Sequence, residues 1–186
     1  MIEVEIKAKI TDKNEALKKI KDIGGVYSHS EEQEDFYFNA PDKDYRKTDE
    51  ALRIRIIPHE DGFKKILTYK GPKLDSISKT RKEVEVEIDD IDNMAEILIN
   101  LGFKVSATVS KVRRIFNYEE YTITLDKLDE LGYFMEIEYV TKEKDDIEKI
   151  TENIMKIFEK LEITEGFERR SYLELLEEKW LYKYIK

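Results

Sequence analysis

The stretch Met1-Ile2-Glu3-Val4-Glu5-Ile6-Lys7-Ala8-Lys9-Ile10 alternates apolar and charged residues with a period of two. In an extended chain, this alternation places the charged side chains on one face and the aliphatic side chains on the other. A half-buried strand of this kind is common when it occurs once. Here the pattern returns at residues 83–88 and 135–139, as Glu-Val-Glu-Val-Glu-Ile and Met-Glu-Ile-Glu-Tyr. The fold therefore has to accommodate three strands with acidic faces.

The same order of segments follows each acidic strand. A helical segment follows it, then a glycine, and then a second segment rich in aromatic or basic residues. The helical segments are 12–24, 91–101 and about 145–161, and the segments after them are 34–38, 111–116 and 168–172. Their spacing is unequal, which excludes a solenoid array. We interpret residues 1–186 as a single domain that uses a β-α-β arrangement three times.

The rest of the chain supplies further strands and one more helix. Asp61-Gly62 is a strong hairpin turn between alternating segments at 51–57 and 65–70. Ser171 and Glu174 form a capping box that opens a last helix. Other extended segments are predicted at 26–39, 103–118 and 121–127, and polar loops at 42–49 and 72–79. The total, about eight strands and four helices, predicts an α+β fold.

Composition narrows the classes of function. The chain has a net charge of −9, which argues against a nucleic-acid-binding protein with a generally basic surface. It has no apolar run near the length of a membrane span and no leader-like segment, so we expect a cytoplasmic protein that does not bind membranes. Disulfides are excluded because cysteine is absent, and two isolated histidines, His29 and His59, make a zinc site unexpected.

The charged strand faces can point either into the lumen of a barrel or outward into water. An eight-stranded closed sheet has a lumen wide enough for side chains or one small ligand. If amphipathic helices cover the apolar faces from outside, the charged faces point into this lumen. A dry lumen would leave unpaired ions, which cost several kcal/mol each. A wet lumen that binds a metal and a polyphosphate avoids that cost, because carboxylates suit Mg²⁺ or Mn²⁺ and Arg and Lys suit phosphoryl oxygens. The alternative is an apolar lumen with charged faces in water.

Several motifs, in a fixed order along the chain, favour the barrel with a wet, charged lumen. The N-terminal Glu3-x-Glu5-x-Lys7 resembles the signature of the CYTH superfamily, the triphosphate tunnel metalloenzymes, which includes class IV adenylyl cyclases, thiamine triphosphatases and inorganic triphosphatases. One such motif is weak evidence, but others follow at similar spacing. They are Gln33-x-Asp35-x-Tyr37-Phe38, Leu52-Arg53-Ile54-Arg55, Thr68-Tyr69-Lys70-Gly71, Arg81-x-Glu83-x-Glu85, Lys111-x-Arg113, Asp126, Leu131-Gly132-x-Phe134-x-Glu136-x-Glu138 and Ser171-Tyr172-Leu173-Glu174-Leu175-Leu176.

The resemblance implies an eight-stranded antiparallel tunnel with a polar lumen, flanked by helices, formed by one CYTH domain over residues 1–186. It implies Mg²⁺ or Mn²⁺ as cofactor, with carboxylate ligands that act directly or through water: Glu3, Glu5, Glu83, Glu85, Glu136, Glu138 and, with less weight, Asp126. It implies that the triphosphate is bound by Lys7, Arg53, Arg55, Lys70, Arg81, Lys111 and Arg113. Glu87 falls outside the motif as a candidate solvated strand end, and Arg114 is expected to face outward.

The family includes two chemistries. We rank first the hydrolysis of the terminal phosphoanhydride of inorganic, nucleoside or thiamine triphosphate, with Glu5 and Lys111 as the catalytic residues. Glu5 is the metal ligand on which turnover depends, and Lys111 either orients or deprotonates the attacking water or binds phosphate. The alternative is a class IV adenylyl cyclase that forms cyclic AMP and pyrophosphate. A further alternative is a polyphosphate- or nucleotide-binding module without catalysis.

Aromatic residues leave two questions open at this stage. An adenylyl cyclase needs a site for adenine, and Tyr37, Phe38 and Tyr172 are candidates to stack a base, although aromatic residues beside apolar ones are more often core. The last helix carries Trp180, Tyr182 and Tyr184, and we expect it either to close one end of the tunnel or to form the contact of a homodimer.

Overall fold

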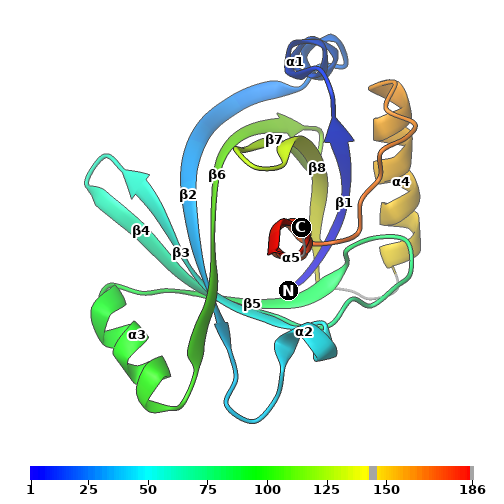
Figure 1. The fold of residues 1–186 in the computed structure, drawn as a ribbon. Coiled ribbons are helices and arrows are strands. Elements are labelled where there is room, and N and C mark those ends of the chain that lie inside the picture. The colour runs from blue at the N-terminus through cyan, green and yellow to red at the C-terminus, as the bar shows by residue number, and fades with distance from the viewer. Residues whose placement is uncertain (143–145, 185–186) are drawn as a thin grey trace.

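The structure is a computed structural model that describes residues 1–142 and 146–184, with side chains as far as residue 181. Eight antiparallel strands close into a barrel in the order β1-β5-β4-β3-β2-β6-β7-β8 (Figure 1). The strands are β1 (Ile2–Ile10), β2 (Val26–Asn39), β3 (Ala51–His59), β4 (Gly62–Lys70), β5 (Arg81–Glu87), β6 (Lys104–Tyr118), β7 (Tyr121–Leu128) and β8 (Gly132–Thr141). The predicted α+β class and eight-stranded antiparallel barrel are confirmed.

The described residues form five helices around this barrel. They are α1 (Lys13–Asp22), α2 (Tyr45–Thr48), α3 (Ile91–Asn100), α4 (Ile147–Lys160) and α5 (Tyr172–Tyr184). The count exceeds the predicted four because the short helix α2 lies inside the segment 42–49, which we expected to be a loop. Asp44 caps α2 by accepting a hydrogen bond from the Arg46 backbone N–H. The predicted helix start near residue 145 lies at the edge of residues 143–145, which are outside the described part of the chain.

The apolar face of β1 points outward and packs under α4. The alternate residues from Ile2 to Ile10 are all buried, and they share one hydrophobic cluster with Ile154 and Phe158 of α4. The other face of β1 places Glu5 and Lys7 inside the barrel, where both are also buried. This side of the barrel therefore has the predicted inversion, with aliphatic side chains outside and ionic side chains inside.

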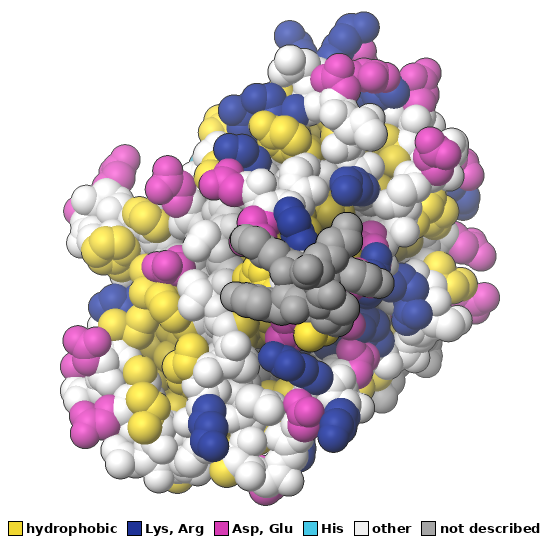
Figure 2. Space-filling model, viewed as in Figure 1, with side chains coloured by type: hydrophobic (Ala, Val, Ile, Leu, Met, Phe, Trp, Pro, Cys, Tyr) yellow, Lys and Arg dark blue, Asp and Glu magenta, His cyan; other side chains and the backbone are white. Residues whose placement is uncertain are grey.

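The prediction that helices cover the apolar faces was wrong for part of the barrel. Val84 and Val86 on the outer face of β5 are 53% and 54% exposed. The expected stripe of α3 is also only partly buried, because Leu98 packs into the core while Ile97 and Leu101 are exposed. Figure 1 gives the reason, since α3 lies to one side of the barrel. Figure 2 shows hydrophobic side chains gathered on the surface of the molecule on the side where α3 lies.

The predicted β-α-β arrangement was also wrong in its strand pairing. The helices α1 and α3 connect strands that are not neighbours, because β1 pairs with β5 and β8 whereas β2 pairs with β3 and β6. The third segment, 168–172, contains no strand. Instead the chain before α5 runs along the edge of β1, where Lys9 N–H donates to Gly166 O and Glu168 N–H donates to Lys7 O. These contacts satisfy backbone groups that β5, which pairs with β1 only at its start, does not reach.

The predicted hairpin and the predicted capping box are confirmed, but the turn of the hairpin lies one residue before the expected Asp61-Gly62. Residues 60 and 61 form the turn, and Gly62 is the first residue of β4, where it pairs with His59. Ser171 and Glu174 form the capping box of α5, because the Ser171 backbone N–H donates to Glu174 Oε2 at 2.6 Å and the Glu174 N–H donates to Ser171 Oγ at 3.1 Å. Among the described residues, no helix is long and apolar enough to cross a membrane.

The packing of α4 on β1 can be tested by truncating its central side chain. Ile154 is fully buried, so Ile154→Ala leaves a cavity, and we expect the free energy of unfolding to fall by about 3 kcal/mol. Lys156→Ala, at an exposed position of the same helix, is expected to change it by less than about 0.5 kcal/mol. Chemical denaturation of both variants measures the difference, and equal losses would contradict the assignment of this face to the core.

Candidate functional site

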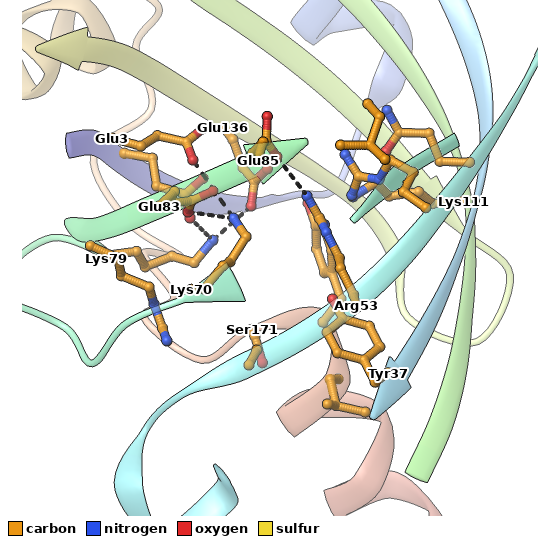
Figure 3. Close-up of a pocket in the computed structure, with 18 of the residues that line it drawn as sticks. Glu3, Tyr37, Arg53, Lys70, Lys79, Glu83, Glu85, Lys111, Glu136 and Ser171 are labelled. Atoms are coloured by element: carbon orange, nitrogen blue, oxygen red, sulfur yellow. Dashed lines mark hydrogen bonds and ion pairs between the residues drawn. The ribbon is translucent and has the colours of Figure 1, made fainter. Parts of the chain in front are cut away.

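The barrel encloses a cavity of about 390 Å³ that is lined mainly by charged side chains. Most of the acidic residues come from β1, β5 and β8, and most of the basic residues come from β3, β4 and β6 (Figure 3). The exceptions on the strands are Arg81 of β5 and Glu31 of β2. The first turns of α5 also line it, through Ser171, Tyr172 and Glu174, and α5 lies across the lumen in Figure 1. The last helix therefore lies at the tunnel, which agrees with the expectation that it closes one end. Its proposed dimer contact stays a prediction, and the side chains of Tyr182 and Tyr184 are outside the described part of the chain.

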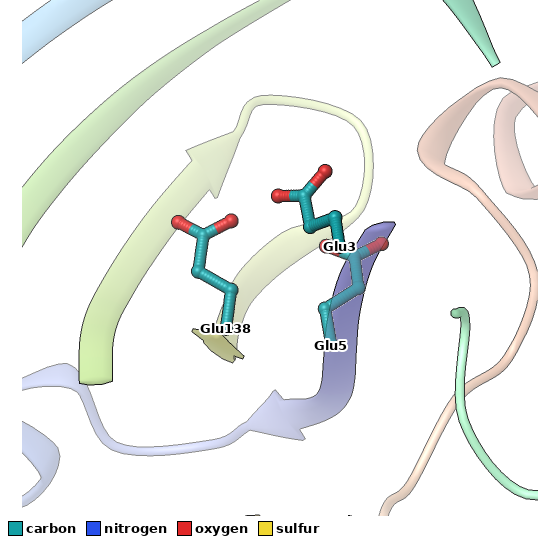
Figure 4. Close-up of side chains that lie close together, drawn as sticks. All are labelled: Glu3, Glu5 and Glu138. Atoms are coloured by element: carbon teal, nitrogen blue, oxygen red, sulfur yellow. The ribbon is translucent and has the colours of Figure 1, made fainter. Parts of the chain in front are cut away.

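Three carboxylates meet on one wall of the cavity. One oxygen from each of Glu3, Glu5 and Glu138 lies within 4.8 Å of the others, as Figure 4 shows. The strand register produces this group, because Glu5 is the direct antiparallel partner of Glu138 and Glu3 lies on the same face of β1. Of the predicted metal ligands, these three are the ones that the structure brings together most closely.

The other predicted acidic ligands surround this group. Glu83 is an ion-pair partner of Lys70, which also lies 3.6 Å from Glu3. Glu136 contacts Arg113 and lies 2.9 Å from the Lys79 ammonium. Glu85 lies nearer the rim, where it accepts a hydrogen bond from Thr68 at 2.9 Å and its side chain is 35% exposed.

Burial and mutual repulsion separate the pKa values of these carboxyl groups. Burial and the nearby Glu3 raise the pKa of Glu138 well above its usual value. Burial also raises the pKa of Glu83 to about 7, although Lys70 opposes this shift. Burial opposes ionisation of Glu3 as well, but Lys70 and hydrogen bonds from Glu138 and Glu83 outweigh it and lower the pKa of Glu3. The carboxyl groups of this cluster therefore differ in how readily each one ionises.

This cluster fits a hard divalent cation. Its donors are carboxylate oxygens, which Mg²⁺ and Mn²⁺ prefer. A cation bound to Glu3, Glu5 and Glu138 would also stabilise the ionised form of Glu138, whose pKa burial and the nearby Glu3 raise.

Two arginines on the opposite wall are held by one buried aspartate. Asp35 accepts two hydrogen bonds from Arg55, at 2.6 and 2.8 Å, and a third from Arg53 at 3.2 Å. The pairing of β2 with β3 places Asp35 directly opposite Arg55. Burial opposes ionisation of Asp35, but the two arginines outweigh it and hold the pKa of Asp35 well below its usual range. The guanidinium groups are thus fixed before any ligand binds.

A second aspartate fixes the basic side chains of β6. Asp126 is fully buried, and it accepts hydrogen bonds from Arg113 at 2.6 and 2.8 Å and from Tyr172 Oη at 2.8 Å. The Lys111 ammonium lies 3.9 Å from Asp126 and 5.0 Å from the centre of the Tyr172 ring. Asp126, a predicted metal ligand, therefore lies among cations and outside the Glu3–Glu5–Glu138 group.

Lys111 meets the condition that a role as proton acceptor requires. Burial, together with the charges of Arg113 and Arg55, lowers the pKa of Lys111 to about 7. Burial and the charge of Lys79 lower the pKa of Lys7 to about 7 in the same way. Both side chains are buried, and a pKa of about 7 allows each amine to gain or lose a proton near neutral pH.

The remaining predicted phosphate-binding residues lie at different depths. Lys70 is inside the barrel with Glu83, whereas Arg81 donates to the backbone oxygens of Asp49 and Gly71 at 2.8 and 3.2 Å. Lys7 is 1% exposed; its ammonium donates to Arg170 O and lies 4.1 Å from the centre of the Tyr172 ring. Among the described residues, the lining of the cavity includes Lys70 and Arg81 but not Lys7.

Sequence reasoning missed two charged residues of the site. Asp35 stood in a quoted motif, and its period-two relation to Tyr37 was a signal that it shares the inward face. Lys79 lay in a segment taken for a polar loop and carried no periodic signal. The structure places its ammonium between Glu5 and Glu136. Glu87 and Arg114, which were expected to face solvent, are both exposed.

The aromatic residues considered for adenine stacking have other partners. Phe38 is buried in a hydrophobic cluster with Leu52 and Ile54, and it is also among the residues that line the cavity. The ammonium groups of Lys7 and Lys111 lie near the ring of Tyr172, and the Tyr172 hydroxyl donates a hydrogen bond to Asp126. Tyr37 lines the cavity but packs in a cluster with Tyr172.

Comparisons with known proteins agree with this geometry. The family model of the CYTH domain matches residues 1–172. A Methanocaldococcus jannaschii protein named "Putative adenylate cyclase" is 45% identical over 176 residues, which cover 94% of this chain and 98% of that protein. The Aeromonas hydrophila "Adenylate cyclase CyaB" is 25% identical over 154 residues, 82% of this chain and 76% of that protein. A solved structure from Pyrococcus horikoshii is 47% identical with a TM-score of 0.88, covering 95% of this chain and 99% of that one.

The anchoring of two arginines by Asp35 gives a stability prediction. Asp35→Asn leaves Arg53 and Arg55 buried without their carboxylate, and we expect the free energy of unfolding to fall by about 3 kcal/mol. Glu34→Gln is the matched control, because Glu34 is the exposed neighbour on the same strand, and its effect should stay within about 0.5 kcal/mol. Guanidinium denaturation at neutral pH measures both. A loss for Asp35→Asn no larger than for the control would contradict the anchoring role.

Proposed function

The chain belongs to the CYTH domain family, and from this premise we propose that it is a metal-dependent triphosphatase. Its proposed reaction is hydrolysis of the terminal phosphoanhydride bond of inorganic triphosphate or of an organic triphosphate, such as a nucleoside or thiamine triphosphate. The observation that carries the proposal is one cavity with carboxylates on one wall and fixed guanidinium groups on the other.

The proposed metal is Mg²⁺ or Mn²⁺. Glu3, Glu5 and Glu138 are its proposed central ligands, because their oxygens already converge. Ligands that act through water or from the periphery are proposed to be Glu83, Glu85, Glu136 and Asp126. When bound, such an ion lowers the pKa of water and polarises a phosphoryl oxygen.

The basic wall is proposed to hold the triphosphate. Arg53 and Arg55 are fixed by Asp35, and Arg113 is fixed by Asp126, so these guanidinium groups need little reorganisation to bind phosphoryl oxygens. The other proposed binding residues are Lys7, Lys70, Arg81 and Lys111. Lys7 is assigned an electrostatic role through its place behind the Tyr172 ring.

Glu5 and Lys111 are the proposed catalytic residues. Glu5 is the member of the carboxylate group on which both the antiparallel partner Glu138 and the loop residue Lys79 converge. Lys111 lines the cavity near Arg113 on β6. Its ammonium lies 3.9 Å from Asp126, whereas the Arg113 guanidinium lies 2.6 Å from the same carboxylate. From this position, Lys111 is proposed to orient the attacking water and accept its proton, or to bind a phosphoryl oxygen.

Adenylyl cyclase is the second candidate function. The names of the two relatives favour it. The packing of Tyr172 favours hydrolysis, because its ring lies against the ammonium groups of Lys7 and Lys111. Stacking of adenine on Tyr172 would displace at least one of these ammonium groups from the ring.

A product assay decides between these functions. The protein is incubated with tripolyphosphate, ATP or thiamine triphosphate in the presence of Mg²⁺ or Mn²⁺. We expect release of orthophosphate. Formation of cyclic AMP and pyrophosphate from ATP would replace the proposal by the cyclase, and binding without turnover of any of the three would indicate a non-catalytic binding module.

The carboxylate assignment predicts a loss of metal-dependent turnover on removal of one negative charge. Glu5→Gln and Glu138→Gln keep the side-chain volume, and each should lower turnover at least about 100-fold, which is the upper part of the range seen when a group around a metal is changed. Glu87→Gln, at the exposed end of β5, is the control and should leave turnover unchanged. Circular dichroism checks that the variants fold. Turnover that survives both substitutions would refute the assignment.

A further inference from the structure

The ammonium group of Lys79 lies where two carboxylates of the proposed metal site converge. It contacts Glu5 Oε1 and donates a hydrogen bond to Glu136 Oε1 at 2.9 Å. The side chain is 8% exposed, and it lines the same cavity as the proposed phosphate-binding residues. Lys79 thus contacts Glu5, which is one of the three converging carboxylates together with Glu3 and Glu138.

The backbone of Lys79 is fixed, whereas its side chain is a flexible four-carbon stem. Its N–H donates to Glu5 O at 2.9 Å, so the segment that joins β4 to β5 is bonded to the edge of β1. The neighbours Ser78 and Thr80 are fully buried, and Asp75 accepts hydrogen bonds from the backbone N–H of Ser78 at 2.6 Å. A lysine on such a fixed backbone moves its point charge by changing rotamers, without movement of the loop.

Charge makes the position of this ammonium dependent on what else binds. A divalent cation at Glu5 is attracted to the same carboxylate and repelled by the Lys79 ammonium, so the two cations compete. A triphosphate in the cavity offers oxygens that accept hydrogen bonds from an ammonium group. Lys79 then has an alternative partner at the moment when the carboxylate is needed by the metal.

We propose that Lys79 is a positioning residue that couples the two ligands: it competes with the divalent cation for Glu5 and Glu136, and it moves to a phosphoryl oxygen when triphosphate binds. This inference rests on the proposed metal–triphosphate site. It assigns a role to a residue that lies outside the quoted sequence motifs, and it predicts how that residue changes the affinity for each ligand. Lys79 weakens binding of the metal alone and strengthens binding of triphosphate alone.

The test measures the two ligands separately and needs no turnover. Isothermal titration measures Mn²⁺ binding without triphosphate, and tripolyphosphate binding in EDTA. In Lys79→Met we expect Mn²⁺ to bind about tenfold more tightly and tripolyphosphate about tenfold more weakly, as for ordinary coupling between two sites. A residue that merely supports the fold would weaken both. Lys79→Gln removes the charge with a polar side chain and supplies the same test if Lys79→Met does not fold.

Lys73→Met is the matched control. Lys73 is on the same loop and its side chain is 12% exposed, but its ammonium pairs with Asp49 at 2.7 Å. It should leave Mn²⁺ affinity unchanged. Unchanged or weaker Mn²⁺ binding in Lys79→Met, or unchanged tripolyphosphate binding, overturns the proposal for Lys79.

Glu5→Gln separates this outcome from failure of the proposed function. If the wild-type protein binds Mn²⁺ and Glu5→Gln weakens that binding, the metal site stands whatever Lys79 does. If the wild-type protein does not bind Mn²⁺, the proposed metal site fails, and the inference about Lys79 fails with it.

Discussion

The structure depends on the neutralisation of charge inside a closed barrel. Ions removed from water are stable only with partners of opposite sign and enough hydrogen bonds. Asp35 meets this need for Arg53 and Arg55, and Asp126 meets it for Arg113. Both aspartates are almost completely buried. They turn the guanidinium groups from an electrostatic cost into a fixed binding surface, which still has donors left for an anionic ligand.

The strand order then sorts the remaining charges by sign. In the ring β1-β5-β4-β3-β2-β6-β7-β8, the acidic strands β8, β1 and β5 are consecutive, and the basic strands β3 and β6 flank β2 on the other side. Neither the order nor the sorting follows from chain position, because the strands with acidic faces begin at residues 2, 81 and 132. Barrel closure brings them together. One ligand in the lumen is therefore exposed to carboxylates on one side and to guanidinium groups on the other.

Period-two alternation predicted what was local and failed where tertiary packing decided. The inward face of β1, the hairpin that joins β3 to β4 and the capping box of α5 all followed from neighbouring residues, although the turn of the hairpin lies one residue earlier than predicted. The β-α-β pairing failed because a helix between two strands does not determine which strands become neighbours. Lys79 was invisible for the same reason. Its place in the cavity depends on a backbone hydrogen bond to Glu5, a residue far away in sequence. No periodicity in a loop encodes such a contact.

The cavity reconciles the acidic composition of the protein with the polyphosphate ligand proposed for it. The net charge of −9 describes the field far from the molecule, which ions in solution screen within about 10 Å. A ligand inside the barrel meets Arg53, Lys111 and Arg113 at close range, where screening by salt is weak. The carboxylate wall would repel a bare triphosphate, but a divalent cation bound there reverses the local sign. The two walls thus suit a metal and a polyphosphate together better than either alone.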